Sequence, residues 1–184
     1  RAQIDELIAE GWGASCHSMT HGRITPETAR YEVVESRKAL EETLEREIRM
    51  FIVPGSNENY PAARAVAEEA GYTSILTLWD AVNTPATDLL RLHRTPLIEE
   101  HFAPFYCTFD PYNRLHQARE LGGWVIDYTH IARPLSEMKS PPKEITERHL
   151  QERFEKVVEV GGDEVWLAEP NEVVEYLLGR DRSR

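Results

Sequence analysis

The sequence has few of the features that mark membrane, nucleic-acid-binding or disulfide-rich proteins. Its apolar runs are all far shorter than the roughly 20 residues that span a bilayer, so we expect no membrane-spanning segment. Acidic residues outnumber basic ones 32 to 21, and the net charge of −11 argues against nucleic acid or an anionic membrane as a partner. The two cysteines, Cys16 and Cys107, make neither a disulfide framework nor a Cys-x-x-Cys metal site, and their redox state is left open.

What the chain does contain suits a folded domain. Of its 184 residues, 41% are hydrophobic and 29% charged, which is enough for one core in a single domain over residues 1–184. The opening segment RAQIDELI already has the spacing of an amphipathic helix. Because the chain opens within such a pattern, without Met and without a signal peptide, we expect it to be part of a longer protein, and its localisation is left open.

Helix-type and strand-type patterns alternate along the chain. Short apolar runs predict strands at residues 12–16, 50–53, 74–78, 124–126 and 165–167. Helical spacing predicts one helix that ends at residue 11 and others at residues 25–45, 61–70, 115–121, 145–160 and 171–178. In the helix at residues 25–45 the expected inward positions are Tyr31, Val34, Leu40 and Leu44. This alternation indicates an α/β fold with parallel strands, as an open sheet or a barrel, in which ligands gather at the carboxyl ends of the strands.

Two histidines four residues apart follow the first predicted strand. His17 and His21 lie in the segment CHSMTH, between that strand and a helix start at Thr25 and Pro26. Neutral imidazoles are common ligands of zinc, and two of them on one short loop can face a single ion. The alternative is a pair of unrelated surface histidines.

A glycine-bearing loop follows the second predicted strand and contains Pro54, Gly55 and Ser56. The backbone N–H groups of such a turn can bind an oxyanion. The alternative is a tight turn capped by a Ser or Asn side chain.

His130 follows the fourth predicted strand, in the segment IDYTH. It is either a hydrogen-bonded structural residue or an acid–base group, and the second role needs a partner such as Asp127 or Asp80 to orient the ring. Four tryptophans lie on or beside predicted strands: Trp12, Trp79, Trp124 and Trp166. We expect them in the core, although an aromatic face can also stack on a sugar ring.

Together these segments resemble the polysaccharide deacetylases of carbohydrate esterase family four, which share the nodulation-type chitooligosaccharide deacetylase domain. The most specific part is the histidine segment, because the family has a His-Ser/Thr-x-x-His metal motif followed by a helix like the one predicted here. The sequence FIVPG at residues 51–55 is similar to the third family motif, and WVIDYTH at residues 124–130 is similar to the strand with the general-acid histidine. Residues 165–168 and 172–176 are similar to the family ending. The resemblance implies an irregular (β/α) barrel of the polysaccharide deacetylase type, with its N-terminal part missing from this chain.

Two family features are absent from this sequence. The first motif, Thr-Phe-Asp-Asp-Gly, supplies the catalytic base and the third metal ligand, and no residue before His17 matches it. The arginine of the third motif is replaced by Ile52 or Val53. We therefore expect either that the carboxylates come from an upstream part of a longer protein, or that the site is incomplete.

The resemblance implies a metal-dependent hydrolase that removes acetyl groups from an N-acetylated (or O-acetylated) carbohydrate. His17 and His21 would hold one divalent metal, with zinc the first choice. The turn at Gly55 and Ser56 would stabilise the oxyanion, and His130 would protonate the leaving amine. One alternative is a non-catalytic deacetylase-like domain that binds carbohydrate or acts as a scaffold, and another is a doubly wound domain with an incidental histidine pair. The sugar, the acyl group and the oligomeric state are left open.

Overall fold

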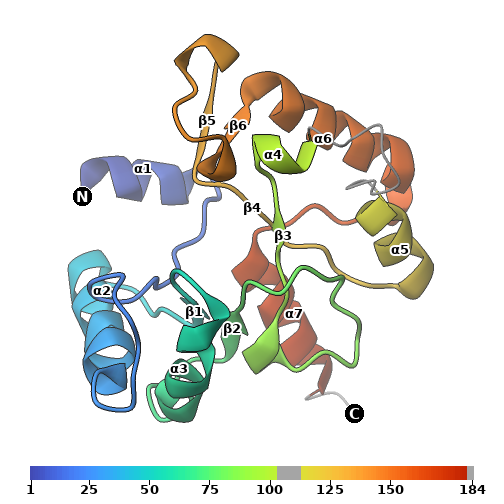
Figure 1. Ribbon diagram of the computed structural model, residues 1–184. Coiled ribbons are helices and arrows are strands. Elements are labelled where there is room, and N and C mark those ends of the chain that lie inside the picture. Colours follow the sequence, from blue (N-terminus) through green and yellow to red (C-terminus); the bar gives the residue numbers. More distant parts are fainter. Residues whose placement is uncertain (103–112, 182–184) are drawn as a thin grey trace. The chain divides into compact units, whose positions relative to one another are not determined.

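A computed structural model of the chain describes residues 1–102 and 113–181 (Figure 1). The chain divides into two compact units, the first made of residues 1–78, 88–92 and 168–184 and the second of residues 79–87 and 93–167. The single domain expected over residues 1–184 stays a prediction. Cys107 lies outside the described residues.

Parallel strand pairing organises the first unit. Strand β1 (Met50–Ile52) pairs in parallel with β2 (Ser74–Leu76). One isolated parallel bridge places Cys16 beside Phe51, and another places Leu92 beside β2. The side chain of Phe51 is fully buried, so these short apolar segments form the centre of the first core. Because the segments are parallel, the residues that follow Cys16 and β1 come to one edge.

Helices of several types accompany these strands. They are α1 (Ala2–Ala9), the π-helix η1 (Arg30–Glu35), α2 (Ser36–Leu44), the 3₁₀ turns η2 (Asn57–Asn59) and η3 (Leu89–Arg91), α3 (Tyr60–Ala67) and α7 (Pro170–Asp181). Ala63 and Ala67 lie four residues apart on α3 and are fully buried, so one face of this helix packs on the core. Val33 of η1 joins the same apolar cluster.

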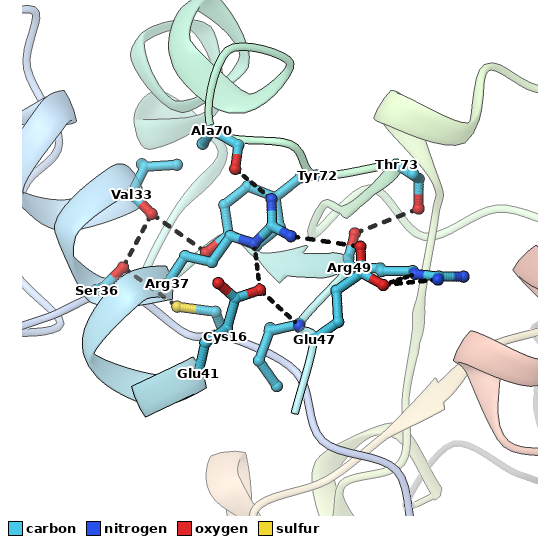
Figure 2. Close-up of polar contacts among 11 residues, drawn as sticks. Cys16, Val33, Ser36, Arg37, Glu41, Glu47, Arg49, Ala70, Tyr72 and Thr73 are labelled. Carbon is cyan, nitrogen blue, oxygen red and sulfur yellow. Dashed lines mark hydrogen bonds and ion pairs between the residues drawn. The ribbon is translucent and has the colours of Figure 1, made fainter. Parts of the chain in front are cut away.

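Arg37 of α2 closes this helix onto the turn that follows α3 (Figure 2). Its guanidinium lies 5.3 Å from the ring centroid of Tyr72 and donates to the carbonyl oxygen of Ala70. Its Nε donates to a carboxylate oxygen of Glu41 at 2.8 Å. A side chain on Gly71 would collide with the guanidinium, and Gly71 has φ +86°, so this turn requires glycine.

The second unit holds two further parallel pairs, β3 (Thr95–Pro96) with β4 (Asp127–Tyr128), and β5 (Ile131–Arg133) with β6 (Glu144–Thr146). Its helices are α4 (Glu99–Phe102), α5 (Asn113–Leu121), α6 (Glu147–Gly161) and the 3₁₀ turns η4 (Leu135–Glu137), η5 (Pro141–Lys143) and η6 (Gly162–Glu164). Helix α6 begins where the Thr146 hydroxyl accepts from the His149 N–H. Val157 and Val160 of α6 then pack in one buried cluster with Ile145.

The structure confirms parallel strands that alternate with helices. Within the described residues the strands form three two-stranded sheets, so a closed barrel is not shown and stays a prediction. In the same part of the chain, every helix is too short or too polar to span a bilayer.

Several local predictions were wrong. Residues 165–167 are irregular, with Trp166 and Leu167 exposed, because this apolar run has no strand partner among the described residues. At residues 124–126 only Trp124 pairs, through one antiparallel bridge, and β4 begins after them. Ile145 was predicted to be helical and lies in β6, because α6 starts two residues later.

Tyr31 was predicted to point inward and is 53% exposed. The reason is that η1 is a π-helix, whose wider turn shifts the buried face onto Glu32, Val33 and Val34. A 3.6-residue period cannot predict such a shift.

Candidate functional site

The rings of His17 and His21 lie side by side on the loop that follows the Cys16 bridge. Their centroids are 4.9 Å apart and their planes are nearly perpendicular, at 78°. Both residues are exposed. The structure therefore brings together the two histidines that the sequence singled out, and it leaves them open to a ligand from solvent.

The ring of His17 is oriented by the backbone of β1. Its Nδ1 lies 2.8 Å from the carbonyl oxygen of Ile52. Because a carbonyl can only accept, Nδ1 carries the proton, and the neutral ring keeps its lone pair on Nε2. Metal-binding histidines typically have this arrangement, in which the nitrogen that does not bind the ion donates to a carbonyl.

The loop between the histidines has an unusual backbone. Ser18 and His21 have φ values of +72° and +60°, in the left-handed region, although neither is glycine. Each such residue costs about 1–2 kcal/mol, so the surrounding contacts must stabilise the loop. One of these contacts is local, because the Ser18 hydroxyl oxygen accepts from the His21 N–H at 2.9 Å.

A second contact comes from Glu32 in η1. Its Oε2 accepts from the backbone N–H groups of Met19 at 3.1 Å and Thr20 at 3.0 Å, and its Oε1 accepts from the Thr20 hydroxyl at 2.5 Å. Burial by itself raises the pKa of this carboxyl, but the hydrogen bonds from Thr20, Met19 and Ser18 together outweigh it and hold the pKa below its usual value. Sequence reasoning missed Glu32, because a single glutamate in a helix usually faces solvent.

The turn at Pro54, Gly55 and Ser56 follows β1. Gly55 has φ +66°, which favours glycine. The Ser56 N–H donates to the Pro54 carbonyl oxygen at 2.8 Å, and the Ser56 hydroxyl accepts from the Glu58 N–H at 3.3 Å to cap η2. This contact agrees with the alternative given in the sequence analysis, a tight turn capped by a Ser or Asn side chain. Since the Ser56 N–H is used within the turn, the Gly55 N–H is the remaining backbone candidate for an oxyanion.

Asn59 joins this turn to Ile24, which lies three residues after His21 at the end of the segment that we call the histidine loop (residues 17–24). The sequence analysis did not identify Asn59. Its Oδ1 accepts from the Ile24 N–H at 2.8 Å, and its Nδ2 donates to the Pro54 carbonyl oxygen at 2.9 Å. The Asn59 side chain is buried. The spacing of 35 residues between Asn59 and Ile24 leaves no local pattern by which the contact could be recognised.

His130 belongs to the second unit, in the bend between β4 and β5, and is exposed. The ring of Tyr128 lies beside it, with centroids 6.4 Å apart. Neither proposed partner orients it among the described residues. Asp127 instead accepts two hydrogen bonds of 2.8 Å from the buried Arg153, and Asp80 accepts from the Thr95 hydroxyl at 3.1 Å. The role of His130 stays a prediction.

The structure also locates the four tryptophans and bears on a third metal ligand. Among the described residues, no group of three or more His, Cys, Asp or Glu side chains could hold a metal ion. Trp12 is 65% exposed and Trp166 is 51% exposed, so the expectation of core packing was wrong for both. Trp79 and Trp124 are half-buried.

Residues 1–75 match the family model of the polysaccharide deacetylases. The match covers the histidine pair, Glu32 and the turn at residues 54–56, and it supports a polysaccharide deacetylase domain in this segment, which is less than half of the chain. His130 lies beyond the matched segment. No curated protein and no solved structure matches the chain.

Proposed function

We propose that this protein is a metal-dependent hydrolase that removes acetyl groups from an N-acetylated (or O-acetylated) carbohydrate. In this proposal His17 and His21 are ligands of one divalent metal, and zinc is the first choice. The observation that carries this proposal is the pairing of two exposed imidazoles within the segment that matches the deacetylase family. A (β/α) barrel and the nodulation-type subtype are parts of the same proposal.

The two imidazoles fit a shared metal. Zinc binds histidine nitrogen at about 2.0–2.1 Å in tetrahedral sites, so two ring centroids around one ion are about 5 Å apart. The observed separation is 4.9 Å, and with the proton on Nδ1 the lone pair of the His17 ring is on Nε2, the nitrogen proposed to bind the ion. The described residues supply only these two ligands, and two imidazoles alone bind weakly. The proposal therefore includes a carboxylate ligand that the described residues do not place beside the two histidines.

The chemistry of the proposed site is amide or ester hydrolysis. When bound, the metal polarises the acetyl carbonyl and lowers the pKa of a water. The Gly55 N–H would donate to the developing oxyanion. The proposed carboxylate base would take the proton of the water, and a general acid, for which the sequence analysis named His130, would give a proton to the leaving amine.

Metal analysis combined with acetate release tests this proposal. On the full-length gene product, we expect about one zinc per chain after loading, lost in His17→Ala, and acetate release from acetylated chitooligosaccharides that depends on the metal. The matched control is His116→Ala, because His116 is an exposed histidine on α5 outside the matched segment. Equal zinc content in wild type, His17→Ala and His116→Ala would contradict the metal site.

A second candidate function is carbohydrate binding without hydrolysis, which the exposed Trp12 favours. A solvent-facing indole in the same unit as the histidine pair offers a face for a pyranose ring. If chitooligosaccharide binds without acetate release, and Trp12→Ala weakens that binding while His17→Ala does not, the non-catalytic function replaces the hydrolase.

A further inference from the structure

The carboxylate of Glu32 is placed to control the geometry of the histidine pair without touching either ring. It is buried, with an exposed fraction of 4% for the residue, and its hydrogen bonds from the loop between the two histidines include those from the Met19 N–H, the Thr20 N–H and the Thr20 hydroxyl. These bonds engage Met19 and Thr20, two of the three residues between the histidines. The loop is only three residues long, so a displacement of Met19 and Thr20 moves one histidine relative to the other.

The helix that carries Glu32 is itself anchored. Glu32 lies in the π-helix η1, between the exposed Tyr31 and the fully buried Val33. The Ser36 hydroxyl donates to the Glu32 carbonyl oxygen at 2.6 Å. The same hydroxyl lies 3.2 Å from the Cys16 sulfur (Figure 2). Cys16 directly precedes His17. The backbone of Glu32 and the start of the histidine loop are therefore connected through one buried hydroxyl, and the carboxylate acts from a defined position.

We propose that Glu32 is a positioning residue for the metal site, whose buried carboxylate keeps the imidazoles of His17 and His21 side by side. This inference rests on the proposed function, because it concerns the same pair of ligands. Residues that orient metal ligands from outside the coordination sphere typically change metal affinity about 10–100-fold when they are replaced.

Substitutions at position 32 separate positioning from simple packing. Glu32→Ala removes the hydrogen bonds from Met19 and Thr20, and the one from Ser18 as well. Glu32→Gln keeps the volume and one accepting oxygen for the two backbone N–H groups, while its amide NH₂ can donate to the Thr20 hydroxyl, so it restores most of the network. Glu35→Ala is the matched control, since Glu35 lies on the same helix and its carboxylate pairs only with the exposed Lys38 in the described contacts.

The experiment is a titration of the full chain with Zn²⁺ alone, followed by NMR of the histidine ring nitrogens, together with amide hydrogen exchange of Met19 and Thr20 in metal-free protein. We expect Glu32→Ala to weaken Zn²⁺ binding about 10-fold or more and to accelerate exchange at both amides. Glu32→Gln should stay within about 3-fold of wild type, and Glu35→Ala should equal wild type.

Thr20→Val provides a second test in case the Glu32→Ala protein does not fold. It removes the exposed hydroxyl that donates to Glu32 while the shape of the side chain stays nearly the same. We expect a smaller loss of Zn²⁺ affinity and little change in stability.

The outcomes distinguish the two proposals. If His17→Ala abolishes Zn²⁺ binding but Glu32→Ala and Thr20→Val bind it as wild type does, the positioning role is overturned and the metal site stands. If His17→Ala leaves Zn²⁺ binding unchanged, the metal site itself fails and the positioning role fails with it. A loss of affinity in Glu32→Gln as large as that in Glu32→Ala also overturns the inference, because the restored hydrogen bonds should rescue the site.

Discussion

Replacement of Asn59 by alanine should destabilise the first unit, because this side chain joins the turn after β1 to the end of the histidine loop. The Ile24 N–H loses its acceptor at a buried position, which costs about 1–3 kcal/mol. The Pro54 carbonyl oxygen loses one donor but keeps the Ser56 N–H, so its share is only about 0.5–1.5 kcal/mol. We therefore expect Asn59→Ala to lower the free energy of unfolding by about 3 kcal/mol in total.

Equilibrium unfolding in urea measures this change, with Glu58→Ala as the control. Glu58 is the neighbouring residue on η2 and is exposed, so its replacement should change the unfolding free energy by less than about 0.5 kcal/mol. If Asn59→Ala unfolds within about 0.5 kcal/mol of wild type, the two hydrogen bonds do not stabilise the fold as argued.

Asn59→Asp tests the same contacts through the direction in which stability changes with pH. An aspartate at this position can accept from the Ile24 N–H, but it must keep its proton to donate to the Pro54 carbonyl oxygen. Its pKa in the folded protein should therefore lie above the ordinary value of about 3.9. The variant should be most stable below that pH and lose stability as the pH rises through the raised pKa. A variant whose stability is independent of pH relative to wild type would show that the carbonyl contact is absent.

Two further predictions concern the second unit. Arg153→Leu should lower the unfolding free energy measured in urea by about 3 kcal/mol, because it leaves the Asp127 carboxylate without its buried partner. This value is at the lower end for broken buried ion pairs, since the Asp127 side chain is 26% exposed and water can reach it. Glu144 accepts from the Ser140 N–H, which is the main reason that its pKa lies below the usual value. The stability that Glu144 contributes is thus present above about pH 4.3 and is lost as the pH falls through its lowered pKa, so Glu144→Gln should show a shallower acid unfolding curve than wild type.

The parts of the fold that were predicted correctly depend on short-range patterns. The apolar runs that become β1 and β2 are bounded by Pro or Gly, and the spacing of Ala63 and Ala67 gives α3 its buried face. The closeness of the two histidine rings was also recognisable, because His17 and His21 lie within five consecutive residues. In each case the relevant residues are close in sequence, so the pattern itself contains the geometry.

Predictions failed where the geometry depends on a partner that is distant in sequence. The apolar run at residues 165–167 has the composition of a strand but no strand beside it among the described residues, so it remains irregular. Tyr31 faces solvent because η1 adopts a π turn, which a regular helical period does not anticipate. Asp127 could be noticed as an acid next to His130, but its partner is Arg153, 26 residues away.

By itself, the sequence determined the strand or helix type of β1, β2 and α3, the net negative charge, and the closeness of His17 and His21. Only the tertiary structure decided which side chains support them, namely Glu32 beneath the histidine loop and Asn59 between that loop and the turn after β1. The physical reason is that periodicity reports the solvent-facing and core-facing sides of one segment, whereas a buried carboxylate or amide is stabilised by backbone groups from another segment.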